Sequence, residues 1–198
     1  MSFQNPYKFS FSLPLRRPAE FVCVDTETGG IDPAKHALLQ LGFAGSHCDP
    51  ASIYITDSDG TNEAGALLLN RIEPALVAKK GVSREKAREI FTAFVCGRAI
   101  VGHNLAFDLG FICSRLFDLG PYDAGVHLFD AMRLFDTYRI FRALHPKSEA
   151  PSAKLADVAR FYHLEVECEC CHDAMFDAEL TCKIFLAELD EFERRGWR

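Results

Sequence analysis

Two acids separated by one threonine end a short apolar run in the stretch FVCVDTETGG, residues 21–30. Side chains alternate between the two faces of a strand, so Asp25 and Glu27 share a face while Thr26 lies on the other. Two carboxylates at this spacing can reach the same pair of divalent cations. Without a cation, their repulsion would raise one pKa or push the pair into solvent. The spacing therefore indicates either a metal site or a strand that simply ends in water.

A second motif with an acidic residue is VGHNLAFD, residues 101–108. A short apolar strand breaks at Gly102, and Asp108 follows in the first or second turn of the next helix. An acid near a helix N-terminus also favours the helix dipole, and His103 and Asn104 could be cap residues. This motif by itself leaves a structural and a chemical interpretation open.

The third candidate is HDAMFDA, residues 172–178. Asp177 falls in the first turns of the closing helix, and His172 lies just before or at its start, about one turn from Asp177. Asp173 is predicted to be the N-cap of the helix. A histidine at this distance can approach whatever Asp177 binds, although a solvent-exposed cap is the simpler interpretation for a single histidine.

The elements that must position these acids are strands followed by alternating strands and helices. Residues 1–20 contain three prolines and are predicted to be an extension, and residues 21–193 a single domain. Ser83 is predicted to be the N-cap of the first helix. This order favours an α/β domain with a mixed sheet that opens as an antiparallel meander. Strands are predicted at 21–26, 37–45, 52–56 and 99–104, and helices at 83–96, 106–117, 127–144, 153–164 and 173–193.

Taken together and in this order, the motifs resemble those of the DnaQ-like, or DEDDh, family of 3′–5′ exonucleases. The resemblance covers about residues 20–190. Gln40 stands where that family often carries a glutamate, and the stretch between SIYIT and SREKAREI does not align. The residues that match the family motifs are Asp25 and Glu27 in VDTET, Asp108 in VGHNLAFD, and His172 and Asp177 in HDAMFD.

The resemblance implies an RNase H-like fold with a mixed five-stranded sheet flanked by helices. It also implies two Mg²⁺ or Mn²⁺ ions, with Asp25 bridging both, Glu27 and Asp177 on the ion beside the nucleophile, and Asp108 on the second ion. His172 would be the general base, and the unperturbed histidine pKa near 6.5 suits that role.

Further residues are expected to contact the substrate. Gly29 and Gly30 have no side chains, so the terminal nucleotide could approach their backbone closely. Ile31 lies where the family often places an apolar wedge against the terminal base. Phe107 could stack on a base, with core packing as the alternative. The expected substrate-binding set is Thr26, Thr28, Gly29, Ile31, His103, Asn104 and Phe107.

The expected substrate is nucleic acid with a free 3′ end. The family resemblance implies hydrolysis of single-stranded or frayed DNA into nucleoside 5′-monophosphates, in proofreading or repair. A net charge of −6 argues against binding through a broad basic surface but suits an enzyme that meets phosphates through metal ions. One alternative is an exoribonuclease that trims RNA. Another is an inactive relative that binds nucleic acid or a DNA polymerase.

The remaining sequence features concern the location of the protein and the state of its cysteines. No apolar run is long enough to cross a bilayer and no secretion signal is recognisable, so a cytoplasmic protein without membrane partners is expected. Cys23, Cys96, Cys113 and Cys182 lie in apolar patterns and are predicted to be buried thiols. The cluster CECC at 168–171 lacks the spacing of a zinc site and is interpreted as a reduced loop.

Overall fold

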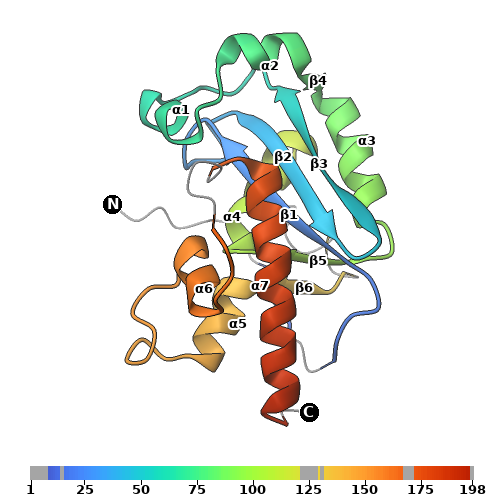
Figure 1. Cartoon of the computed structure of the whole chain (residues 1–198). Helices are drawn as coiled ribbons and strands as arrows, with labels where there is room; N and C mark the ends of the chain where they lie inside the picture. The colour runs from blue at the N-terminus through green and yellow to red at the C-terminus, as the bar shows by residue number, and fades with distance from the viewer. Residues whose placement is uncertain (1–8, 14–15, 121–128, 130–131, 167–171, 197–198) are drawn as a thin grey trace.

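The computed structural model describes residues 9–13, 16–120, 129, 132–166 and 172–196. A six-stranded sheet with the order β4-β3-β2-β1-β5-β6 forms its centre (Figure 1). β1, β2 and β3 pair antiparallel, β5 runs parallel to β1, and β6 runs parallel to β5. The predicted antiparallel meander and mixed sheet are confirmed. The strands are β1 (Phe21–Thr28), β2 (Leu38–Gly45), β3 (Cys48–Thr56), β4 (Val82–Ser83), β5 (Ala99–Gly102) and β6 (Leu134–Asp136).

The sheet has one strand more than the five expected. β4 is only two residues long and pairs parallel with the end of β3. Ser83, its second residue, is also the predicted N-cap of α3 (Arg84–Val95), and its side chain accepts a hydrogen bond from the main-chain N–H of Lys86. A two-residue strand is too short to show the alternation of buried and exposed side chains. The N-cap of α3 is therefore the only feature of this segment that the sequence indicates.

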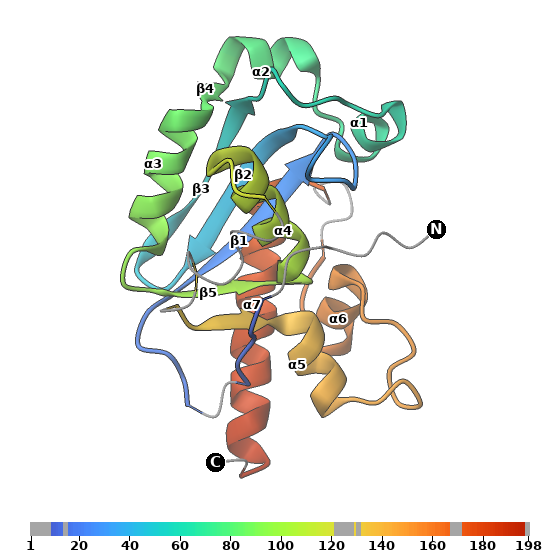
Figure 2. The same cartoon turned by 180° about the vertical axis from the view of Figure 1, so that it is seen from behind.

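Helices cover both faces of the sheet. α7 (Ala174–Arg194) crosses one face, and α3 and α4 (Leu105–Phe111) lie on the other (Figures 1 and 2). Val22 and Val24 of β1 belong to the core shared with α3 and α4, whereas Phe21 and Cys23 belong to the core shared with α7. The alternation expected for β1 is therefore present. Successive residues of the strand face α3 and α4 on one side and α7 on the other.

Two helical segments differ from the sequence prediction. α1 and α2 occupy part of the stretch that did not align with the family, and no helix was predicted there. The helix expected over 127–144 begins only at Thr137, because Leu134–Asp136 form β6, while 121–128 and 130–131 lie outside the described residues. A three-residue strand has no readable period. The remaining helices are α1 (Ala64–Asn70), α2 (Pro74–Lys80), the π-helical turn η1 (Ile112–Leu116), α5 (Thr137–Leu144) and α6 (Leu155–Phe161).

The segment before β1 is packed against the domain. Phe9 and Phe11 are partly buried against the core of α3 and α4, and the main-chain N–H of Ser12 donates to the carbonyl of Leu134 at 2.8 Å. Within the described segments, none of the helices has the length and hydrophobicity that a bilayer crossing demands.

The cysteine predictions are partly confirmed. Cys23 and Cys113 are buried, and Cys182 is partly buried on α7. Cys96 is exposed, contrary to prediction, because it is the C-cap of α3 and lies just beyond the apolar face of that helix. The CECC cluster lies outside the described residues.

Candidate active site

The three acidic motifs meet where β1 extends beyond its neighbour β5. The two strands pair only from Phe21 opposite Ala99 to Cys23 opposite Val101. β1 then continues to Thr28 while the chain leaves β5 and enters α4. The last residues of β1 therefore have one edge without β5 as a partner. Asp25 and Glu27 lie on this part of the strand.

A cavity of about 420 Å³ opens at this place. It is lined by residues from β1, α1, α4, the turn after β5 and the start of α7, which come from distant parts of the chain. All predicted site residues except Gly29 and Asn104 line it. Those that do are Asp25, Thr26, Glu27, Thr28, Ile31, His103, Phe107, Asp108, His172 and Asp177.

Gly29 and Asn104 instead shape the backbone beside the cavity. A Cβ on Gly29 would lie 2.5 Å from the main-chain carbonyl oxygen of Thr61, so only glycine fits against that loop. Asn104 has the left-handed φ of 63°, and its main-chain N–H donates to Asp136 Oδ1 at 2.9 Å. Asparagine tolerates this conformation better than most residues, and the turn directs the chain into α4.

Asp108 and Thr26 approach each other on the α4 side of the sheet. Asp108 is buried in the first turn of α4, as predicted, and only 4% of it is exposed. The Thr26 hydroxyl donates to Asp108 Oδ1 at 2.7 Å. The threonine between the two acids of β1 therefore holds the acid of the second motif, a contact that the strand period alone does not reveal.

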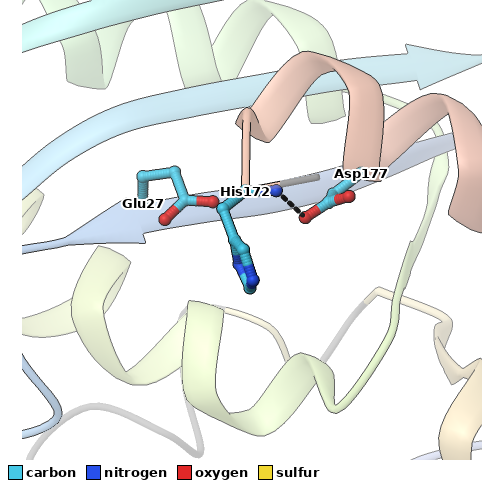
Figure 3. Close-up of side chains that lie close together, drawn as sticks. All are labelled: Glu27, His172 and Asp177. Carbon is cyan, nitrogen blue, oxygen red and sulfur yellow. Dashed lines mark hydrogen bonds between the residues drawn. The ribbon is translucent and has the colours of Figure 1, made fainter. Parts of the chain in front are cut away.

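Glu27, His172 and Asp177 form the tightest group of possible ligands in the described chain. One ligand atom from each lies within 4.8 Å of the other two. The main-chain N–H of His172 donates to Asp177 Oδ2 at 3.2 Å (Figure 3). His172 has the left-handed φ of 68°, a strained conformation for a residue with a side chain. The bend places the histidine beside Asp177, immediately before α7.

The start of α7 is held against β2 by two residues. Asp173 is its N-cap, as predicted, and accepts hydrogen bonds from the main-chain N–H groups of Met175 and Phe176. Gln40 donates to Asp173 Oδ2 at 3.2 Å and accepts from the main-chain N–H of Ala174 at 3.3 Å. An ionised glutamate could not donate to Asp173, which explains the amide at this position.

Burial raises the pKa of the four predicted acids of the cavity, Asp25, Glu27, Asp108 and Asp177, and repulsion from neighbouring carboxylates adds to it. Burial, followed by the charges of Asp108, Asp177 and Glu27, raises the pKa of Asp25 well above its ordinary value. Burial and the charges of Asp177 and Asp108 raise the pKa of Glu27 to about 8. The pKa values of Asp108 and Asp177 are also raised, mainly by burial. The cavity therefore concentrates negative charge that a cation would stabilise.

The donor set suits a divalent cation. Asp25, Glu27, Asp108 and Asp177 offer only carboxylate oxygens, which are the ligands that hard cations such as Mg²⁺ and Mn²⁺ bind. A bound cation would also stabilise the buried negative charges and offset the repulsion between them. The residues present therefore fit the metal dependence implied by the family resemblance.

The two histidines of the cavity have different environments. Burial and the positive charge of Arg71 lower the pKa of His172, which favours a neutral ring at neutral pH. Burial lowers the pKa of His103 to about 4. The His103 ring contacts the hydroxyl of Thr137 at 2.8 Å and the carbonyl of Ala153 at 2.9 Å. Both of its nitrogens have protein partners, so the ring braces the cavity wall.

One wall of the cavity was not foreseen from the sequence. It comes from α1 and the residues beside it, in the stretch that did not align with the family. The helix is short, its exposed face is apolar, and it has neither a side-chain cap nor a clear period, so no sequence signal pointed to it. Its contributions are Glu63, Gly65, Ala66, Leu69 and Asn70.

Comparisons with known proteins found a matching family model and a curated relative. The model of the Exonuclease family (RNase_T) matches residues 22–185. DNA polymerase III PolC-type of Mycoplasmopsis pulmonis (strain UAB CTIP) is 24% identical over 198 residues, which are 98% of this chain and 13% of that protein. The chain thus spans only a small part of that curated relative.

Solved structures of Exonuclease I have the same fold. E. coli Exonuclease I in complex with a dT13 oligonucleotide is 24% identical, with a TM-score of 0.70 over 89% of this chain and 42% of that one. A moderately thermophilic Exonuclease I from Methylocaldum szegediense is 22% identical, with a TM-score of 0.70 over 89% of this chain and 41% of that one. The predicted RNase H-like α/β fold is thereby confirmed.

Proposed function

Because this chain belongs to the Exonuclease family, we propose that it is a metal-dependent 3′–5′ exonuclease. It hydrolyses the last phosphodiester bond of single-stranded or frayed DNA and releases nucleoside 5′-monophosphates. The observation that carries the proposal is the convergence of four carboxylates and His172 on one cavity of about 420 Å³.

Asp25, Glu27, Asp108 and Asp177 would hold two Mg²⁺ or Mn²⁺ ions. Bound there, the ions supply the positive charge that stabilises the attacking and leaving oxygens of a phosphodiester. Asp25 and Glu27 share one face of β1, and Asp177 approaches from α7. Asp108 reaches the cavity from α4 and is held by the Thr26 hydroxyl.

His172 acts as the general base. Its lowered pKa favours a neutral imidazole at neutral pH, so a ring nitrogen can take a proton from the attacking water. The water oxygen bonds to phosphorus as the bond from phosphorus to the 3′ oxygen breaks, and the leaving 3′ oxygen takes a proton from solvent water. The products are a nucleoside 5′-monophosphate and a strand shortened by one nucleotide, with a new 3′ hydroxyl.

An unpaired terminal nucleotide fits the mouth of the cavity. Ile31 lines the cavity and is 53% exposed, and Phe107 lines the same cavity, so an unstacked base would find apolar contacts. The choice of DNA is supported by the Exonuclease I structures, which contain dT13 or dA16 oligonucleotides. Proofreading or repair is the proposed setting, because one relative is a PolC-type DNA polymerase and a mismatched 3′ end frays into a single strand. A DNA polymerase is accordingly a proposed partner.

Digestion of matched DNA and RNA oligonucleotides tests the function. In Mg²⁺ or Mn²⁺, a 5′-labelled DNA strand should shorten stepwise from its 3′ end, while a 3′-labelled strand should release labelled mononucleotide first. EDTA and the Asp25→Ala variant should stop both reactions. Faster digestion of RNA would replace the proposal with an exoribonuclease. No digestion of any strand would point to an inactive binding relative.

A further inference from the structure

An exposed tyrosine lies just outside the cavity, on α5. Tyr138 is in the first turn of that helix, and 39% of it is exposed. β6 runs parallel to β5 with Asp136 opposite Gly102, so the chain enters α5 beside the turn that carries His103. The rings of Tyr138 and His103 form a T-shaped pair with 6.0 Å between their centres. Because His103 lines the cavity, Tyr138 continues the cavity wall outward.

The Tyr138 ring has a fixed position. Its main-chain N–H donates to Asp136 Oδ1 at 3.1 Å, which caps the start of α5. The guanidinium of Arg142, one turn further along the helix, lies 6.0 Å from the centre of the ring. The Tyr138 hydroxyl has no hydrogen-bond partner among the residues that the structure describes. An exposed aromatic ring of this kind is suited to stacking on an unstacked base.

The loop before α6 brings a lysine to the same place. The carbonyl of Ala153 contacts His103 Nε2 at 2.9 Å, and Lys154 follows directly in the chain. Arg142 donates to two carbonyls of this loop, at residues 150–151, over 2.6 and 3.3 Å. The arginine that lies beside the tyrosine therefore also fixes the loop that carries the lysine.

The positive charge of Lys154 is available to a ligand. Lys154 is exposed and forms no ion pair with any residue in the described part of the chain. The acids at the start of α5 and in α6 already have partners, Asp136 with Arg139 at 3.3 Å and Asp157 with Arg160 at 2.9 Å. In a chain with a net charge of −6, an unpaired ammonium beside the cavity favours an anionic group of a ligand that enters it.

We propose that Tyr138 and Lys154 bind the nucleotide that precedes the 3′-terminal one. Its base stacks on the Tyr138 ring, and a phosphate oxygen pairs with the Lys154 ammonium. The inference rests on the proposed function, because it requires the terminal nucleotide to occupy the cavity. Single-stranded nucleic acid is the ligand that offers a flat base and a negative charge in every repeat. A free mononucleotide fills only the cavity and reaches neither residue.

Fluorescence anisotropy with 5′-labelled dT13 tests the stacking. The titrations contain Ca²⁺, which binds carboxylate oxygens as Mg²⁺ does, and a gel confirms that the strand is intact afterwards. Tyr138→Ala should bind about 5- to 150-fold more weakly than the wild type, as expected for the loss of one base–aromatic contact. Tyr138→Phe is the matched control, which keeps the ring and should bind as the wild type does.

The salt dependence of the same binding tests the lysine. For a single strand, each phosphate contact contributes about 0.7 to the slope of log affinity against log salt, so Lys154→Ala should reduce the slope by that amount. Lys79→Ala removes an exposed lysine of α2, which lies far from α6 (Figure 1), and should leave the slope unchanged. An unchanged slope for Lys154→Ala would exclude the phosphate contact.

Thymidine 5′-monophosphate separates stacking from an effect that passes through His103. Because it fills only the cavity, the wild type and Tyr138→Ala should bind it equally in a calorimetric titration with Ca²⁺ present. A loss as large as that for dT13 would show that Tyr138 merely supports the His103 ring. That result would overturn the inference, and so would a Tyr138→Ala variant that binds dT13 as tightly as the wild type.

Neither of these results would affect the proposed function. That function fails instead if the wild-type chain digests no strand in Mg²⁺ or Mn²⁺. If Tyr138→Ala does not fold, Tyr138→Leu is measured with the same expectations, because leucine keeps apolar bulk beside His103 but lacks the flat ring.

Discussion

At the scale of single residues, the site consists of four carboxylates that three elements, β1, α4 and α7, bring to one cavity. The period of a strand was enough to place Asp25 and Glu27 on one face. The position of Asp108 in the first turn of α4 and that of Asp177 near the start of α7 followed from the motifs. The hydrogen bond from Thr26 to Asp108 is a tertiary contact that leaves no pattern in the sequence.

Replacing His172 tests its role as the general base. Positioned general bases contribute about 10²- to 10⁴-fold, so His172→Ala should lower kcat by that factor and leave Mn²⁺ affinity largely intact. Both are measured, with a labelled oligonucleotide and by calorimetry. His163→Ala is the matched control, because His163 is also an exposed histidine with a left-handed φ, of 57°. Full activity of His172→Ala would exclude this role.

His103 should make stability depend on pH. An unfolded histidine is protonated below about pH 6.5, whereas the buried ring resists protonation down to about 4. The unfolded state therefore binds the extra proton in this window, and the contribution of His103 to the free energy of unfolding falls as the pH drops from 6.5 to 4. The predicted loss is up to about 3 kcal/mol.

Urea denaturation of the wild type and His103→Gln at several pH values isolates this effect. The difference between the two curves removes the contributions of the cavity acids, whose raised pKa values act in the opposite direction. The stability advantage of the wild type should shrink as the pH falls from 6.5 to 4. A difference that stays constant with pH would show that the ring titrates as an ordinary histidine.

At the scale of secondary structure, the long amphipathic elements were predictable and the short ones were not. The meander, α3 and α7 have a clear period, and both predicted N-caps, Ser83 and Asp173, are confirmed. β4, β6, α1 and α2 are two to seven residues long and are defined by their neighbours. The strand pairing that leaves the end of β1 unpaired next to the acids depends on where β5 stops, which the sequence marks only by Gly102.

Gly42 should be essential for the close approach of α7 to the sheet. A Cβ at this position would lie 1.9 Å from the carbonyl oxygen of Ala174, so Gly42→Ala must push the start of α7 away from β2. The free energy of unfolding should fall by about 1–3 kcal/mol, and Mn²⁺ affinity should fall because Asp177 moves with the helix.

Urea denaturation and Mn²⁺ titration measure both effects. Gly65→Ala is the control, because nothing lies within 4 Å of a Cβ there and alanine favours the helix of α1. This control should be neutral or slightly stabilising. A Gly42→Ala variant as stable as the wild type would show that α7 can shift without cost.

At the scale of the whole molecule, a buried ion pair joins segments on either side of the unforeseen α1 and α2. Arg115 of η1 donates to both oxygens of Asp57, at 2.7 and 2.6 Å, just after β3. Asp57 also accepts from the main-chain N–H of Leu38 at 3.1 Å. Both charged residues are buried, so each depends on the other for its stability.

Removing one partner of this pair should be costly. Arg115→Ala leaves the buried Asp57 carboxylate with the more distant Arg84, at 3.9 Å, as its countercharge, and we expect the free energy of unfolding to fall by about 3–5 kcal/mol. Arg17→Ala removes an exposed ion pair with Asp190 and should cost less than about 1 kcal/mol. Chemical denaturation compares the two. Equal, small effects would contradict the structural importance of the buried pair.

Anomalous diffraction from crystals soaked in Mn²⁺ tests the central claim most directly. The account predicts two manganese peaks in the cavity, surrounded by the carboxylates of Asp25, Glu27, Asp108 and Asp177. An absence of peaks there, or manganese bound only elsewhere on the chain, would contradict it.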